Sequence, residues 1–301
     1  MPSFRAAPVR VRVPATSANL GPAFDSAGLA LGLYDDVVVR VADSGLSVDV
    51  AGEGSDSLPR DKKHLVVRCL RETFARLGGQ PRGLEVVCAN RIPQSRGLGS
   101  SSAAIVAAVV AARSLVLGGE DELDDDATLR LATELEGHPD NVAACLVGGL
   151  TFAWESPQGV KVRRLDVHPD IAPVAFVPTT KASTKKVRGL LPETVPHADA
   201  AANSARAALL ALALTRDPSL LLDATEDRLH QSYRASAMPR SAWLVDKLRT
   251  AGIPAVISGA GPTVLALASQ STIDEVVAKA PKGWDVLPLP VETTGATVVP
   301  L

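Results

Sequence analysis

A loop of glycines and serines that leads directly into an alanine- and valine-rich stretch constrains this chain more than any other feature. Residues 84–88 ahead of it have the character of a strand, so the local order is strand, loop, helix. Gly97 and Gly99 can adopt backbone angles that are closed to other residues, and the serines after them lie where the first helical amides have no partner inside the helix. Because the helix dipole makes that end positive, the stretch predicts an anion site that suits a phosphate.

Two common nucleotide-binding motifs do not match this loop. A Walker loop needs a lysine before its serine or threonine, and this loop has none. Ser102 stands where a G-x-G-x-x-G motif needs its third glycine. A turn followed by a serine-capped helix is therefore the alternative interpretation of the same residues.

The composition is that of an ordinary globular protein and excludes several classes of function. The chain has 301 residues, of which 46% are hydrophobic and 21% charged, enough for a sizeable core in one or two domains. A formal charge of -2 gives no sign of a basic surface, and 3% aromatic residues leave few rings for base stacking, so we expect no nucleic-acid partner. The longest apolar run, residues 103–112, falls short of the ~18 residues that cross a bilayer, so we expect no membrane partner.

The beginning of the chain and its cysteines favour a cytoplasmic location. Arginines interrupt the stretch up to Val13, which has no apolar signal core. Cys69, Cys88 and Cys145 are odd in number and lie in apolar surroundings. This pattern is typical of buried reduced thiols, and neither disulfides nor a metal site is expected from it.

A polar turn near the beginning is the second notable stretch. Alternating valines predict a half-buried strand over residues 9–13, and residues 14–22 then predict a long turn before another strand at residues 36–41. Asn19 lies in this turn and Asp25 just beyond it. Such side chains usually bond to the local backbone, so a role in function is the less common alternative.

A compact group of His138, Asp140 and Asn141 forms the third stretch, held by a glycine and a proline after a predicted helix at residues 127–136. This is good material for an active site, although a histidine in a turn commonly bonds only to the main chain. If the glycine loop binds a nucleotide, Mg²⁺ that bridges its phosphates needs one or two carboxylate or hydroxyl ligands. Ser101 and Glu134 are the pair that we choose, with Glu136 left open as the alternative carboxylate.

The second half of the chain reads as a separate domain. Prolines near residue 168 predict the boundary, which divides the chain into residues 1–168 and 169–301. Residues 183–188 predict a basic turn, and three helices are expected at residues 203–214, 226–236 and 243–251. Gly259 lies in a glycine loop between strands expected at 255–257 and 263–267, which indicates either close approach of a ligand or a structural turn.

Four separated stretches together resemble the homoserine kinase family, within the GHMP superfamily of small-molecule kinases. These stretches are residues 14–22 with Phe24 and Asp25, 93–104, 136–141 and 258–263. The likeness covers nearly the whole chain, although Ala23 replaces an expected glycine and Ser102 a commoner alanine. It implies an α+β fold with an N-terminal domain similar to ribosomal protein S5 and a ferredoxin-like C-terminal domain.

The resemblance also implies an activity and a set of site residues. The activity is transfer of phosphate from ATP, with Mg²⁺, to the side-chain hydroxyl of L-homoserine for threonine biosynthesis. The sequence is compatible with a homodimer and does not fix the oligomeric state. Arg188 and Arg234 would bind the substrate carboxylate. The ammonium end would meet Asp25, Asn19 and His138, near Gly259. The ATP-binding residues would be Pro93, Gln94, Ser95, Arg96, Gly97, Leu98, Gly99, Ser100, Ser101, Ser102 and Ala103.

The predicted chemistry depends on positioning more than on a base. Phosphoryl transfer has a loose transition state that demands little early deprotonation of the acceptor. Asn141 would orient the hydroxyl next to Arg188, and Asp140 is the alternative as a general base. A mevalonate- or shikimate-type kinase, a decarboxylase of the same fold and a nucleotide sensor without catalysis are the other functions considered.

Overall fold

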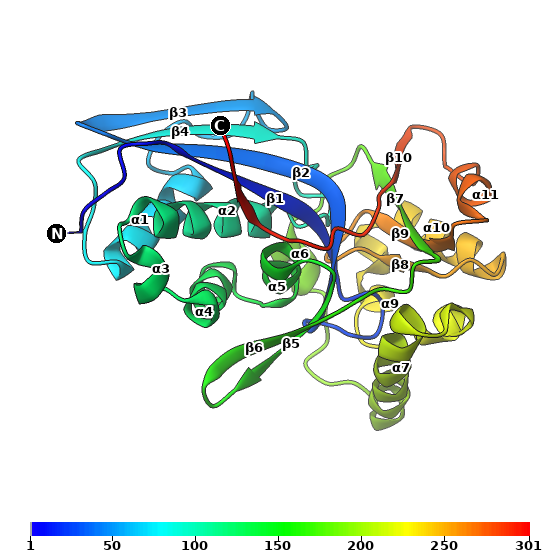
Figure 1. Ribbon diagram of the computed structural model, residues 1–301. Helices are drawn as coiled ribbons and strands as arrows, with labels where there is room; N and C mark the ends of the chain where they lie inside the picture. The colour runs from blue at the N-terminus through cyan, green and yellow to red at the C-terminus, as the bar shows by residue number, and fades with distance from the viewer. Residues whose placement is uncertain (1) are drawn as a thin grey trace.

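Two sheets organise the fold. In the computed structural model, which describes residues 2–301, there is one seven-stranded and one four-stranded sheet. Figure 1 shows the two sheets side by side, and each sheet together with its helices is called a layer. The blue and cyan strands belong to the first layer and the orange strands to the second. The elements of the first layer are β1 (Val9–Ala18), β2 (Ala27–Ala42), β3 (Gly45–Gly52), α1 (Leu65–Arg76), β4 (Gly83–Asn90), α2 (Ser100–Leu115), α3 (Gly119–Glu122), α4 (Asp125–Glu136), α5 (Asp140–Val147), β5 (Leu150–Ser156), β6 (Gly159–Leu165) and β11 (Thr297–Val299).

The second layer follows in the sequence, except that the chain end leaves it. Its elements are β7 (Ile171–Pro178), α6 (Thr184–Arg188), α7 (His197–Thr215), η1 (Pro218–Leu220), α8 (Leu221–Ala224), α9 (Gln231–Arg234), η2 (Ala235–Ala237), α10 (Pro239–Thr250), β8 (Ala255–Ile257), β9 (Val264–Ser269), α11 (Ile273–Val277) and β10 (Trp284–Pro288). The order in the sheet is β10-β7-β9-β8, and each neighbouring pair is antiparallel. The hairpin expected around Gly259 is confirmed by β8 and β9.

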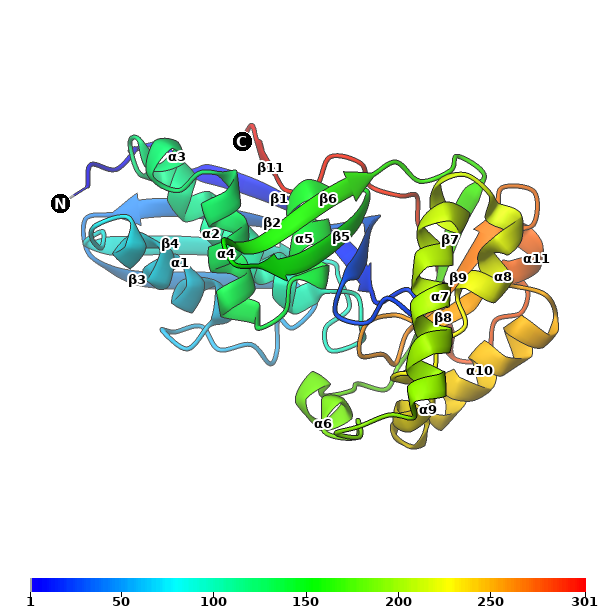
Figure 2. The ribbon, with the colours of Figure 1, turned by 90° about the horizontal axis from the view of Figure 1, so that it is seen from below.

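The first sheet has the order β11-β1-β2-β4-β3, with β5 and β6 continuing from β2. The helices of this layer lie on one face of it, and α2 runs through the middle of the core (Figures 1 and 2). Small side chains allow α2 to be enclosed on nearly every side, since Ala103, Ala107 and Ala111 are fully buried together with larger neighbours. The glycine and serine loop before it, called the phosphate loop (residues 93–104 with the first turn of α2), therefore leads into a largely buried helix.

The first strand is longer than the sequence indicates. β1 pairs with β2 as far as Ala18, so the turn predicted at residues 14–22 begins only after that residue. A register shift between Pro14 and Ala15 lets the strand continue past a proline, which has no amide hydrogen for a regular ladder. The polar end of this strand thus lies at the junction between the two layers.

Two predictions about the second layer are wrong in detail. Residues 183–188 contain the short helix α6 instead of an open turn. The helix predicted at 226–236 is limited to α9 and the following 3₁₀ turn η2. The Asp227 carboxylate explains the late start, because it accepts hydrogen bonds from the backbone amides of Leu229, His230 and Gln231 and holds the preceding residues as a loop.

The chain returns to the first layer at its end. The change between sheets falls between β6, which ends at Leu165, and β7, which begins at Ile171. However, Val291 bridges to Leu31 and β11 pairs with β1. The range 169–301 expected for the second domain did not anticipate this return. Within residues 2–301, no helix has the length and apolar character needed to cross a membrane.

Candidate active site

A pocket lies at the junction of the two layers, and segments remote in sequence line it. They are the turn after β1, the phosphate loop, the end of α4, the beginning of α5, α6, α9 and the loop between β8 and β9. Most of the residues expected from the sequence line this one pocket, namely Asn19, Asp25, Ser95, Gly97, Gly99, Ser100, Ser101, His138, Asp140, Asn141, Arg188, Arg234 and Gly259. Phe24, Glu136, Thr184 and Ala260 complete the lining.

The phosphate loop needs both of its glycines. Gly97 and Gly99 have φ angles of 80° and 72°, in the left-handed region, and a Cβ on either would collide with the Ser258 carbonyl or the Thr16 hydroxyl respectively. Gly99 is the N-cap of α2, and no side chain caps that helix. The alternative of a serine-capped helix is thus wrong, and the first amides of α2 are available to an anion.

Other residues of the expected ATP-binding loop contact the rest of the protein and do not line the pocket. Arg96 donates to the backbone carbonyls of Pro178 and Thr179, at 2.8 and 3.1 Å, and so ties the loop to the end of β7. Leu98 is fully buried in the core. Pro93, Arg96, Leu98 and Ser102 line neither this pocket nor the one described below, within the part of the chain that the structure describes.

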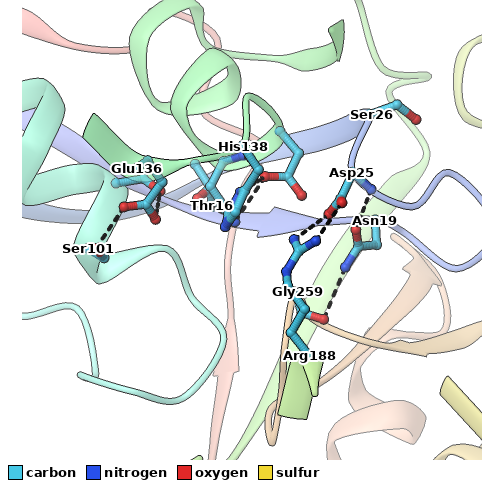
Figure 3. A network of polar contacts seen from close by, with 12 residues as sticks. Thr16, Asn19, Asp25, Ser26, Ser101, Glu136, His138, Arg188 and Gly259 are labelled. Atoms are coloured by element: carbon cyan, nitrogen blue, oxygen red, sulfur yellow. Dashed lines mark hydrogen bonds and ion pairs between the residues drawn. The ribbon is translucent and has the colours of Figure 1, made fainter. Parts of the chain in front are cut away.

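Glu136, and not Glu134, lies against the phosphate loop. Its carboxylate accepts hydrogen bonds from the hydroxyls of Ser101 and Ser102, both at 2.8 Å (Figure 3). Glu134 instead pairs with Arg76 at 3.1 Å on the surface. Glu134 and Glu136 are two residues apart on a helix, so their side chains point about 200° apart. Only one of them can therefore face α2. The pairing of Ser101 with Glu134 is corrected accordingly to Ser101 with Glu136.

An ion pair occupies the side of the pocket nearest the second layer. Arg188 from α6 donates to both oxygens of Asp25 at 2.7 Å, in the parallel geometry that a guanidinium and a carboxylate prefer. Asn19 accepts from the amide of Asp25 at 2.9 Å and donates to the Gly259 carbonyl at 3.1 Å. Three segments are joined in this way around one charged pair.

Arg234 is a buried cation that forms no ion pair with a carboxylate among residues 2–301. Its exposed fraction is 2%, and its Nε has no hydrogen-bond partner within residues 2–301. Burial lowers the pKa of Arg234, and the nearby charge of Arg188 lowers it further. Both guanidinium groups lie over the ring of Phe24, at 5.1 and 5.3 Å from its centroid. The arrangement concentrates positive charge and leaves Arg234 in need of an anion.

His138, Asp140 and Asn141 form a hydrogen-bonded group at the beginning of α5. The His138 Nδ1 lies 2.6 Å from Asp140 Oδ1, which also accepts from the backbone amide of Asn141 at 2.7 Å. The hydrogen bond to Asp140 is the main cause that raises the pKa of His138. The hydroxyl of Thr16 donates to Asn141 Oδ1 at 2.8 Å from the opposite side.

A second, more apolar pocket opens on the other side of the same loop. It shares Ser95, Ser100 and Ser101 with the first pocket and extends to His64 at the beginning of α1. His64 is buried, neither of its ring nitrogens has a partner within residues 2–301, and burial lowers its pKa. His64 could not be identified from the sequence, because a histidine before a helix carries no signal until the fold places it beside the loop.

The comparisons with known proteins agree with this geometry. The family described as GHMP kinases N terminal domain matches residues 64–149, and GHMP kinases C terminal matches 205–286. The chain is 66% identical to a homoserine kinase of Streptomyces coelicolor over 300 residues, which cover 100% of this chain and 97% of that protein. The chain belongs to the homoserine kinase family. A homoserine kinase of Clavibacter michiganensis is 53% identical, over 96% of this chain and 93% of its own length.

Solved structures place this homoserine kinase family member in the GHMP fold. The crystal structure of homoserine kinase from Cytophaga hutchinsonii superposes with a TM-score of 0.86 at 29% identity, covering 99% of both chains. A mevalonate kinase from L. major in complex with R-mevalonate gives a TM-score of 0.71 at 17% identity, over 98% of this chain and 100% of that one. The second likeness concerns the fold alone. The two-domain α+β GHMP fold predicted from the sequence is confirmed.

Proposed function

We propose that this protein transfers the γ-phosphate of ATP to the side-chain hydroxyl of L-homoserine. The observation that carries the proposal is the buried Arg234 guanidinium without a carboxylate, beside the paired charges of Arg188 and Asp25 and within one pocket with the phosphate loop. A zwitterionic amino acid offers both a carboxylate and an ammonium group. The membership in the homoserine kinase family supports the same substrate.

The charges of the pocket complement the two ends of this substrate. The carboxylate would bind Arg234 and Arg188, since arginine binds carboxylates through two parallel hydrogen bonds. Arg188 and Asp25 neutralise each other across 2.7 Å contacts, so an incoming zwitterion can replace each partner with a group of the same charge. Asn19 would hold Asp25 in place for the ammonium group.

ATP would bind from the side of the second pocket. Its phosphates would meet the free amides at the beginning of α2, and its nucleoside would enter the apolar pocket that shares Ser95, Ser100 and Ser101. The γ-phosphate would then lie beside these shared serines, between the two pockets. Donor and acceptor would thus approach from opposite sides of one loop.

Ser101 of this loop and Glu136 at the end of α4 together fit a magnesium ion. The Ser101 hydroxyl and the Glu136 carboxylate lie together beside the amides of α2, and Mg²⁺ in phosphoryl-transfer sites takes one or two protein oxygens in addition to phosphate oxygens. When bound, Mg²⁺ neutralises charge on the phosphates. The Glu136 carboxylate accepts hydrogen bonds from the hydroxyls of both Ser101 and Ser102, so its oxygens face the loop.

The geometry favours transfer without an obligatory base. Asp140 is 2% exposed, and its Oδ1 accepts from His138 and from the Asn141 amide, as an orienting carboxylate does. Asn141 lines the pocket and would hold the acceptor hydroxyl in line with the phosphate. Because the transition state is loose, alignment and charge neutralisation would supply most of the acceleration.

A coupled ADP-release assay with homoserine, mevalonate, shikimate and galactose tests the proposal. We expect ADP release that depends on homoserine and a phosphorylated product. Turnover only with mevalonate or shikimate, release of carbon dioxide from mevalonate diphosphate, or ATP binding without turnover would each replace the proposal by one of the alternative functions. A cytoplasmic location and a homodimer remain predictions that fractionation and light scattering can check.

A further inference from the structure

Thr16 lies beside the reacting end of the pocket without lining it. Its side chain is fully buried on β1, and its backbone amide donates to the Leu98 carbonyl of the phosphate loop at 3.1 Å. Its hydroxyl donates to Asn141 Oδ1 at 2.8 Å (Figure 3). This hydroxyl is also the atom with which a Cβ on Gly99 would collide. A single residue therefore links the phosphate loop, through its backbone amide, to Asn141, through its hydroxyl.

The contacts around Asn141 determine which way its amide faces. Asn141 Nδ2 lies on the side of the Asp140 carboxylate, 3.5 Å from Oδ1, while Asn141 Oδ1 faces Thr16. An ionised carboxylate only accepts hydrogen bonds, so the amide nitrogen belongs on its side. Thr16 can donate its hydroxyl proton to the oxygen on the other side. A flipped amide would direct its oxygen at the carboxylate and is disfavoured.

We infer that Thr16 is a positioning residue that fixes the amide of Asn141 for phosphoryl transfer; this rests on the proposed function. With Oδ1 held by Thr16, Asn141 presents Nδ2 to the oxygen of the acceptor hydroxyl. The remaining lone pair of that oxygen forms the bond to the γ-phosphorus, and the bond from phosphorus to the β,γ-bridging oxygen breaks. ADP leaves, and the hydroxyl proton passes to an oxygen of the transferred phosphoryl group.

The contact between Thr16 and Asn141 also sets the distance between the γ-phosphate of ATP and the acceptor hydroxyl. Thr16 packs against Gly99 at the N-cap of α2, where the phosphates would bind, and against Asn141 at the beginning of α5. The ends of two helices thus meet at one residue, whose amide bonds to Leu98 before α2 and whose hydroxyl bonds to Asn141 in α5. A shift in this contact would misalign the reacting atoms without removing any group that binds either substrate, so kcat should respond more than KM.

The test compares Thr16→Val with Thr16→Ser. Valine keeps the shape and removes the donor, and serine keeps the donor and removes the methyl group. We expect Thr16→Val to lower kcat about 10- to 100-fold, with the homoserine KM and the ATP Kd within about 2-fold of the parent. Thr16→Ser should keep kcat within about 3-fold. Thr16→Val combined with Asn141→Ala should be no slower than Asn141→Ala alone, since both changes remove the same oriented Asn141 amide.

Three results would overturn the inference. They are a parental kcat in Thr16→Val, equal losses in the valine and serine variants, and a double variant whose loss is the product of the single losses. If Thr16→Val does not fold, Asn141→Asp supplies the test, because it keeps the oxygen held by Thr16 and replaces only Nδ2; a parental kcat would then refute the role of Nδ2. A parent protein inactive with homoserine would refute the proposed function instead, and the variants would be compared with the acceptor that the panel identifies.

Discussion

Replacing Arg234 with methionine should weaken substrate binding and stabilise the free protein at the same time. The change keeps a long side chain in a site where only 2% of the residue is exposed. Losing one partner of a desolvated carboxylate contact costs roughly 2 to 5 kcal/mol. At 1.4 kcal/mol for each factor of ten, the homoserine KM should rise about 30- to 4,000-fold. ATP affinity, measured by calorimetry, should stay unchanged.

The stability of the free protein should move in the opposite direction. Burial lowers the pKa of Arg234, so the folded protein disfavours its charge. Removing the charge relieves this cost, although the Nδ1 of His230, 3.3 Å away, loses a donor. We expect the free energy of unfolding in urea to rise by about 1 kcal/mol. A KM within about 2-fold of the parent, or a loss of stability large enough to explain the weaker binding, would refute the role of Arg234.

Arg188→Met is the matched control for this prediction. Arg188 pairs with Asp25 and its side chain is 40% exposed, so its removal breaks an ion pair without relieving a buried charge. The homoserine KM should rise in this variant as well, but the free energy of unfolding should not increase. The Arg234 and Arg188 variants should then both have a raised homoserine KM, but only the Arg234 variant should have a higher free energy of unfolding.

Three further predictions concern the phosphate loop and His138. Gly99→Val should abolish ATP binding in calorimetry, whereas Gly252→Val, at a similar φ of 77° with open space around it, should not. Glu136→Gln should raise the Mg²⁺ concentration for half-maximal rate about 10-fold or more and Glu134→Gln should leave it unchanged; equal effects would contradict the Ser101–Glu136 site. Asp140 raises the pKa of His138, so the contribution of this pair to stability should be complete below the unfolded pKa of about 6.5 and be lost as pH rises through the folded value. His138→Gln should remove that pH dependence from urea unfolding curves.

The parts of the site that are local in sequence were predictable from it. The strand, glycine loop and helix at residues 84–104 identify an anion site because backbone freedom, end-of-helix amides and the helix dipole are properties of neighbouring residues. The hairpin at Gly259 and most of the helices follow from the same local rules. The resemblance of four separated stretches to one family then indicated the substrate.

Only the tertiary structure decided which remote groups meet. Asp25 and Arg188 are 163 residues apart, and nothing in their spacing says that they pair at 2.7 Å. Glu134 and Glu136 are equivalent in the sequence, but the packing of α4 against α2 turns just one of them toward Ser101. Thr16 looked like part of a turn until the pairing of β1 with β2 placed it on a strand below Asn141. Such contacts depend on how whole elements pack, and the energy of packing is shared among many residues that no local pattern contains.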